Sequence, residues 1–263
     1  STEFNKALSG VGAVANATAG DLDLLRKAAL QAGADTAFSA SEAATAEAEL
    51  ARAGLSTSDV LGGALSGSLD LAAAGQLDLG TAATITAQAL NVFGLEGDQA
   101  SHVADVLAAG ANKSATDVNE LGQALAQGGL VADQFGIGLE DTIGTLSLFA
   151  DKTLVGSDAG TSFKTMLQRL VPQSAEAKSA MDDLGLSFFD SAGNFVGIAE
   201  TAQQLQDALG GLSEEQRAGA LTTLFGSDGI RAANILYEEG AAGVRKYSAA
   251  VNDSGAAQRM AAA

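Results

Sequence analysis

The chain has 263 residues, of which 47% are hydrophobic, and it carries 32 Asp and Glu against 14 Lys and Arg. The apolar fraction is enough for a folded core and argues against wholesale disorder. Cysteine is absent, which excludes disulfides and cysteine-based metal sites. The net charge of −18 argues against specific nucleic-acid binding, because such binding depends on Lys and Arg that neutralise phosphates.

Alanine-rich segments predict an all-α fold, an Ala/Gly-rich multi-helix array of short helical hairpins. Alanine is the strongest helix former, β-branched and aromatic residues are scarce, and Pro172 is the single proline. Four segments show the capping-box pattern of a hydroxyl three residues before an acid or amide, at 39–42, 56–59, 114–117 and 213–216. We predict helices over 21–32, 40–53, 57–74, 80–93, 98–111, 115–127, 139–151, 158–170, 174–184, 198–209, 214–225, 228–238 and 241–252.

The ending Leu-x-x-x-Gly-Leu occurs three times, at 50–55, 90–95 and 125–130. Glycines at such positions close helices by adopting a left-handed conformation, and we expect this of Gly33, Gly54, Gly75, Gly94 and Gly129. The 40- and 35-residue spacings leave two interpretations open. The ending is either a trace of a repeated helical hairpin or helix termination that recurs in an Ala-rich chain.

Two features define the expected organisation. The segment 184–198 has apolar runs on either side of a turn-rich cluster, and it predicts one small β-hairpin. We expect an N-terminal helical or linker segment over 1–20 that continues from a longer chain. A helical domain over 21–255, with a sub-boundary near 130–138, and a C-terminal linker over 256–263 would follow it.

The residues offer no catalytic centre. His102 is the only histidine, and Asp98 and Asp105 share its helix face, so a charged surface pair is the expected role. Adjacent carboxylates such as Glu140 and Asp141 point about 100° apart on a helix, so they are poorly placed to act together in acid–base catalysis. Their expected role is to stabilise the first turn of the helix, where the helix dipole favours acidic residues. We therefore expect no enzyme activity, no cofactor and no metal. The sequence has no stretch of 18 continuous apolar residues, so it predicts no membrane-spanning helix.

Two amphipathic stripes are candidates for interaction. Helical spacing places four apolar residues on one face and three on another. Core packing is the expected role of both stripes, and a partner or self-association face is the alternative. The stripes consist of Phe163, Met166, Leu167 and Leu170, and of Leu221, Leu224 and Phe225.

Four segments in order resemble the core region of phage tail tape measure proteins. The first is "LLRKAALQAGADTAFSASEAATAEAELARAGLSTSDV" at 24–60, and the others cover 69–125, 136–170 and 184–236. Each motif is weak by itself, because Ala-rich helices resemble one another. Their order, with the single predicted hairpin after a Leu-Gly, makes the resemblance specific over about 20–255.

The resemblance implies a structural role in the virion. Proteins of this family lie in the tail tube or tail tip, set tail length during assembly and leave ahead of the genome. It implies a homo-oligomer, a trimer by family resemblance, with tail tube, distal tail and tail assembly chaperone partners. It also implies host-membrane contact during ejection, and localisation to the virion after assembly in the host cytoplasm. The alternative is a helical protein-interaction module with an acidic surface that is not part of a virion.

Overall fold

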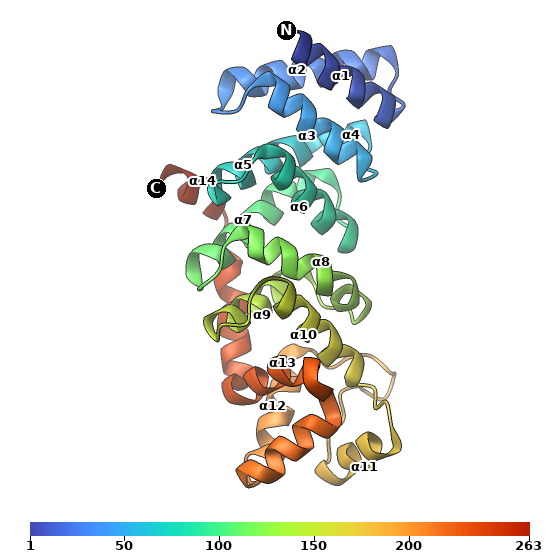
Figure 1. Ribbon diagram of the computed structural model, residues 1–263, viewed down its shortest axis with the longest axis vertical. Coiled ribbons are helices and arrows are strands. Elements are labelled where there is room, and N and C mark those ends of the chain that lie inside the picture. Colours follow the sequence, from blue (N-terminus) through green and yellow to red (C-terminus); the bar gives the residue numbers. More distant parts are fainter. The chain divides into compact units, whose positions relative to one another are not determined.

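A computed structural model describes all residues from 1 to 263, and they divide into two compact units. Unit 1 consists of Ser1–Ala109 and Asp253–Ala263, and unit 2 consists of Gly110–Asn252. No residue lies in a β-strand, so the prediction of an all-α fold is confirmed (Figure 1). The limits expected at 20, 130–138 and 255 within a longer chain stay predictions. The segment expected as a C-terminal linker contains a short helix.

Unit 1 is built around α3, against which both α1 and α2 pack. Helix α3 also contacts α6, while α5 lies between α6 and the C-terminal helix α14. The elements of unit 1 are α1 (Thr2–Ala15), α2 (Ala19–Asp35), α3 (Ala40–Arg52), α4 (Thr57–Asp59), η1 (Val60–Ala64), α5 (Leu65–Gly75), α6 (Leu79–Val92), η2 (Gly97–Gln99), the first part of α7 (Ala100–Lys113) and α14 (Ala256–Ala262).

Unit 2 is organised by the long α13, which packs against α9, α10, α11 and α12. Helix α10 also packs closely on α8. The elements of unit 2 are the end of α7, α8 (Val118–Gln134), α9 (Leu139–Asp151), α10 (Gly156–Arg169), α11 (Ala175–Leu184), α12 (Ile198–Leu209) and α13 (Glu214–Val251).

Helix α13 is broken at two glycines (Figure 1). Gly226 has φ 68° and ψ −176°, and Gly240 has φ 66° and ψ −171°, a backbone region that is essentially restricted to glycine. The two breaks leave three helical pieces, which agree with the helices predicted over 214–225, 228–238 and 241–252.

Small side chains allow helices in both units to approach closely. A Cβ atom on Gly67 would lie 2.6 Å from the Cβ of Ala100, and one on Gly144 would lie 2.7 Å from the Cα of Ser248. Such distances are shorter than real Cβ contacts, so a larger residue would force the helices apart. The Ala and Gly content is therefore a requirement of the packing in both units.

The recurring Leu-x-x-x-Gly-Leu is a helix C-cap at two of its three positions. The Leu55 N–H donates to the Leu50 carbonyl at 3.1 Å and the Leu95 N–H to the Leu90 carbonyl at 2.8 Å, each across a glycine with positive φ. These are the 6→1 bonds of a Schellman motif. Gly129 is different, because α8 continues through it and ends at Gln134, where Gly136 supplies the positive φ of the C-cap instead. The predicted end of this helix near 127 was wrong.

The predicted β-hairpin at 184–198 is also wrong. Only an isolated antiparallel bridge forms, between Phe189 and Phe195. One oxygen of Asp190, Oδ1, accepts hydrogen bonds from the N–H groups of Ala192 and Asn194, each at 2.9 Å. Because the aspartate and the turn satisfy these amides locally, the paired segments stay too short to form strands.

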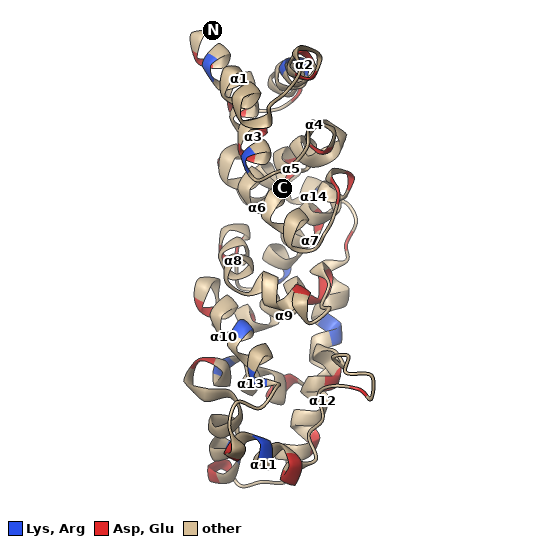
Figure 2. Ribbon diagram, turned by 90° about the vertical axis from the view of Figure 1, so that its right-hand side faces the viewer, with Lys and Arg blue, Asp and Glu red and all other residues tan.

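Acidic residues dominate both units (Figure 2). Unit 1 has five Lys and Arg against 14 Asp and Glu, and unit 2 has nine against 18. The excess is therefore the same in each unit and does not create one acidic and one neutral part. Mutual repulsion of this size keeps a protein soluble and disfavours contact with phosphate backbones.

Candidate functional site

The seven residues of the predicted association stripes are all buried. Phe163, Met166 and Leu167 lie on α10, and Leu170 follows it directly. None of the four is more than 1% exposed, and the three on α13 are at most 3% exposed, namely Leu221, Leu224 and Phe225. In this conformation the stripes form core contacts, which is the expected role.

The helices that carry these stripes are joined by a polar bridge as well as by apolar packing. The Ser162 hydroxyl donates to the Asp228 carbonyl at 2.6 Å and accepts from the Ala232 N–H at 3.0 Å. A Cβ on Gly229 would lie 3.1 Å from the Met166 nitrogen, so the two backbones nearly touch. An association face made of these residues would require α10 and α13 to separate, and that role stays a prediction.

A glutamate lies inside the core of unit 1. Glu47 on α3 is fully buried, and neither carboxylate oxygen has a hydrogen-bond partner. Burial raises the pKa of Glu47 to about 8, because desolvation disfavours the charged carboxylate. Glu47 lies four residues after Ala43 and three before Leu50, so its position on the apolar helix face was readable from the sequence.

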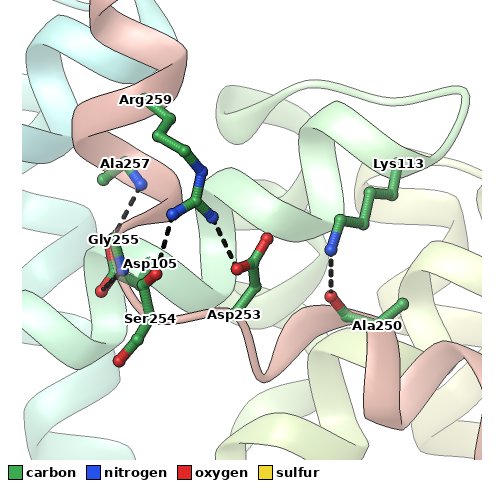
Figure 3. A network of polar contacts seen from close by, with 8 residues as sticks. All are labelled: Asp105, Lys113, Ala250, Asp253, Ser254, Gly255, Ala257 and Arg259. Carbon is green, nitrogen blue, oxygen red and sulfur yellow. Dashed lines mark hydrogen bonds and ion pairs between the residues drawn. The ribbon is translucent and has the colours of Figure 1, made fainter.

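The C-terminal helix α14 is held in unit 1 by a second carboxylate (Figure 3). Asp105 accepts from the N–H of Gly255 at 2.9 Å and from the N–H of Ala257 at 3.0 Å, which makes it the cap of that helix. Burial, with the nearby Asp105 charge, raises the pKa of Asp70. Arg259 closes the turn by bonding to Asp253 and to the Ser254 carbonyl.

An aspartate joins α9 to α13 in unit 2. Asp151 accepts from the Ala115 N–H at 2.7 Å and from the Tyr247 hydroxyl. Burial and this hydrogen bond raise the pKa of Tyr247 to about 12. In the same unit, the Lys113 ammonium donates to the Ala250 carbonyl at 2.8 Å (Figure 3). These contacts tie helices of unit 2 together.

Unit 2 also contains a hollow lined by three aromatic rings. The rings of Phe135, Phe189 and Phe195 lie 5.5 to 6.2 Å apart between centroids, and all three are half-buried. They line a hollow of about 600 Å³ together with Val171, which is 49% exposed. The backbone around Gly136, Gly193 and Asn194 completes its wall, and we call this feature the aromatic hollow.

The structure offers no metal centre and no membrane-spanning segment. No three or more His, Cys, Asp or Glu side chains are placed to share a metal ion. None of the helices combines the length and the hydropathy that crossing a bilayer requires.

The sequence matches a known family over most of its length. The model of the phage-related minor tail protein family matches residues 26–226. The chain belongs to this family of phage tail proteins. The match includes residues of both compact units, and it covers all or most of each segment that resembles tape measure proteins.

Two curated relatives of the chain are described as tape measure proteins. The tape measure protein of Pneumococcus phage Dp-1 is 36% identical over 260 residues, which is 98% of this chain and 22% of the relative. The probable tape measure protein of Escherichia phage P2 is 32% identical over 234 residues, which is 88% of this chain and 28% of the relative. The chain thus spans about a quarter of the length of these relatives. No solved structure matches the chain.

Sequence reasoning missed the contacts that depend on distant segments. Asp105 and Gly255 are 150 residues apart, and nothing in either local sequence indicates that they meet. The aromatic hollow likewise combines the end of α8 with the turn at 190–194. The available signal was local composition, because Phe135 precedes Gly136, and Phe189 and Phe195 flank the turn-rich cluster at 190–194.

Proposed function

We propose that this chain is a structural segment of a phage tape measure protein. In this role it lies in the tail tube or tail tip, sets tail length during assembly and leaves the tail ahead of the genome. The family match over 26–226 carries the proposal, and two relatives described as tape measure proteins support it. The family relation favours this role over that of an acidic interaction module outside a virion.

The physical character of the chain is compatible with a place in the path of DNA. No Lys or Arg occurs between Arg52 and Lys113, and the net charge is −18. With 14 Lys and Arg against 32 Asp and Glu, few cations can neutralise phosphates, so DNA would slide past the segment and not adhere to it. We expect homo-oligomers, with a trimer as the first model, and contacts with tube, distal tail and chaperone proteins. Host-membrane contact during ejection is part of the same proposal.

Tail length provides the test of the length-setting role. An in-frame duplication of 1–263 in the parent gene should lengthen the tail, as measured by electron microscopy of the virions. An α-helix rises 1.5 Å per residue, so a fully helical extended copy would add roughly 390 Å. Virions that contain the longer protein but have tails of unchanged length would contradict this role. A parent protein absent from purified tails would contradict the virion location as well.

A further inference from the structure

The phenylalanines of the aromatic hollow differ from the other phenylalanines of unit 2. Phe149, Phe163, Phe188 and Phe225 are at most 2% exposed and belong to the core. The three phenylalanines of the hollow remain half-buried, although they already contact one another. Exposed apolar surface of this kind marks interaction sites when it is gathered in one concave place.

The hollow is held in shape by backbone hydrogen bonds. The Asp190 N–H donates to the Asn194 carbonyl at 2.8 Å, and the Val196 N–H donates to the Phe188 carbonyl at 3.0 Å. On the other side, the Gly136 N–H donates to the Asp133 carbonyl at 2.8 Å. A surface that is already ordered loses little conformational entropy on binding, so even a small ligand group can be held there.

The charges around the hollow identify the kind of partner. None of its lining residues is Lys or Arg, and two exposed aspartates, Asp133 and Asp190, are chain neighbours of lining residues. Unit 2 carries nine Lys and Arg against 18 Asp and Glu, so its long-range field attracts cations. Aromatic ring faces also attract ammonium and guanidinium groups.

We propose that the aromatic hollow is a docking site for a partner polypeptide segment that carries a bulky apolar side chain flanked by Lys or Arg. The apolar side chain fills the space between the three rings and Val171. The flanking cations lie over the ring faces and toward Asp133 and Asp190. This inference does not depend on the proposed tail role, because it rests on the surface of unit 2 alone.

Model peptides test the proposal on the 263-residue chain. Isothermal titration calorimetry would compare peptides of sequence KKFKK, KKAKK and EEFEE, each with blocked ends. KKFKK should bind about tenfold more tightly than either of the others, because only it supplies both the ring and the cations. Equal binding of KKFKK and KKAKK would overturn the proposal, since it would show general attraction to an acidic surface. Absence of binding by all three would also overturn it.

A matched pair of variants locates the binding. Val171→Lys places a charge in the hollow and should weaken KKFKK binding about tenfold. Leu130→Lys makes the same kind of change at a residue that is 60% exposed and does not line the hollow, so binding should not change. Equal effects of the two variants would overturn the assignment to the hollow. Analytical sedimentation would also show whether the chain self-associates. If Val171→Lys abolished self-association and Leu130→Lys did not, a second copy of the chain would be the occupant, and the proposed cationic partner segment would be wrong.

Discussion

The carboxylate of Asp105 accepts a hydrogen bond from the backbone N–H of Gly255, although 150 residues separate them in the chain. Its second oxygen accepts from the N–H of Ala257, so a side chain on α7 caps the first turn of α14. A helix of seven residues is not stable alone in water. The position of α14 in unit 1 therefore depends on this cap and on its packing against α5.

Replacing Asp105 should release α14. Asp105→Ala removes both acceptors and should cost about 1–2 kcal/mol, as for other lost helix caps. Hydrogen exchange followed by mass spectrometry should show loss of amide protection over 255–262. Asp105→Asn keeps one acceptor oxygen and should give an intermediate loss. Asp98→Ala, at an exposed aspartate on η2, is the control. If it reduced amide protection over 255–262 as much as Asp105→Ala does, the capping role of Asp105 would be contradicted.

Glu47 should make the stability of unit 1 depend on pH. Its folded-state pKa of about 8 is above the ordinary value of 4.5, so the folded state holds a proton that the unfolded state loses. The stability from this group is complete below pH 4.5 and is lost as the pH rises toward 8. Glu47→Met keeps an unbranched side chain without the ionisable group. The unfolding free energy of Glu47→Met minus that of the wild type should be about 3 kcal/mol larger at pH 7 than at pH 4.

Urea unfolding followed by circular dichroism at the two pH values measures this difference. Glu49→Gln is the matched control, because Glu49 lies two residues away on the same helix and forms a surface ion pair with Arg52. Removing such a pair changes stability by less than about 1 kcal/mol. If Glu47→Met gained equally at both pH values, ionisation of the buried carboxyl would not be the cause.

Local signals predicted most helices, because each helix carries its own start and stop. Ser39 and Ser213 form complete capping boxes with Glu42 and Gln216, as their spacing indicated. The predicted ranges 139–151 and 198–209 agree with α9 and α12. Where a signal was ambiguous the prediction failed, as at Gly129, which lies inside α8 and does not end it.

Contacts between distant segments could not be predicted from one sequence. Periodicity placed Phe163 and Phe225 on apolar faces, and the structure buries both, but the pattern did not state which helices would meet. The segment 184–198 has the composition of a hairpin, yet the side chain of Asp190 accepts from the N–H groups of Ala192 and Asn194 at the turn, and only one isolated bridge forms. The alternation of apolar and polar residues in a sequence cannot show that a side chain will bond to backbone N–H groups at the turn.

The two breaks in α13 should require glycine. Gly226 and Gly240 combine positive φ with ψ near 180°, a region that costs other residues about 1–3 kcal/mol. Alanine at either position should therefore lower the thermal midpoint measured by circular dichroism. Asparagine tolerates the left-handed helical region but not this one, so Asn variants should be no more stable than Ala variants. Rescue by asparagine would show that the backbone at these breaks is left-handed helical instead.

The closeness of α8 and α10 yields the last prediction, which compares two glycines in helices of unit 2. A Cβ on Gly160 would collide with the carbonyl oxygen of Ala124, so Gly160→Ala should lower the unfolding free energy by about 1–3 kcal/mol. Gly219 has no atom within 4 Å of its Cβ position and lies in a helical piece of α13. Gly219→Ala should stabilise the protein by about 0.5–1 kcal/mol, because alanine favours helix. Urea unfolding of both variants would separate the two effects, and a stabilising Gly160→Ala would contradict the close approach.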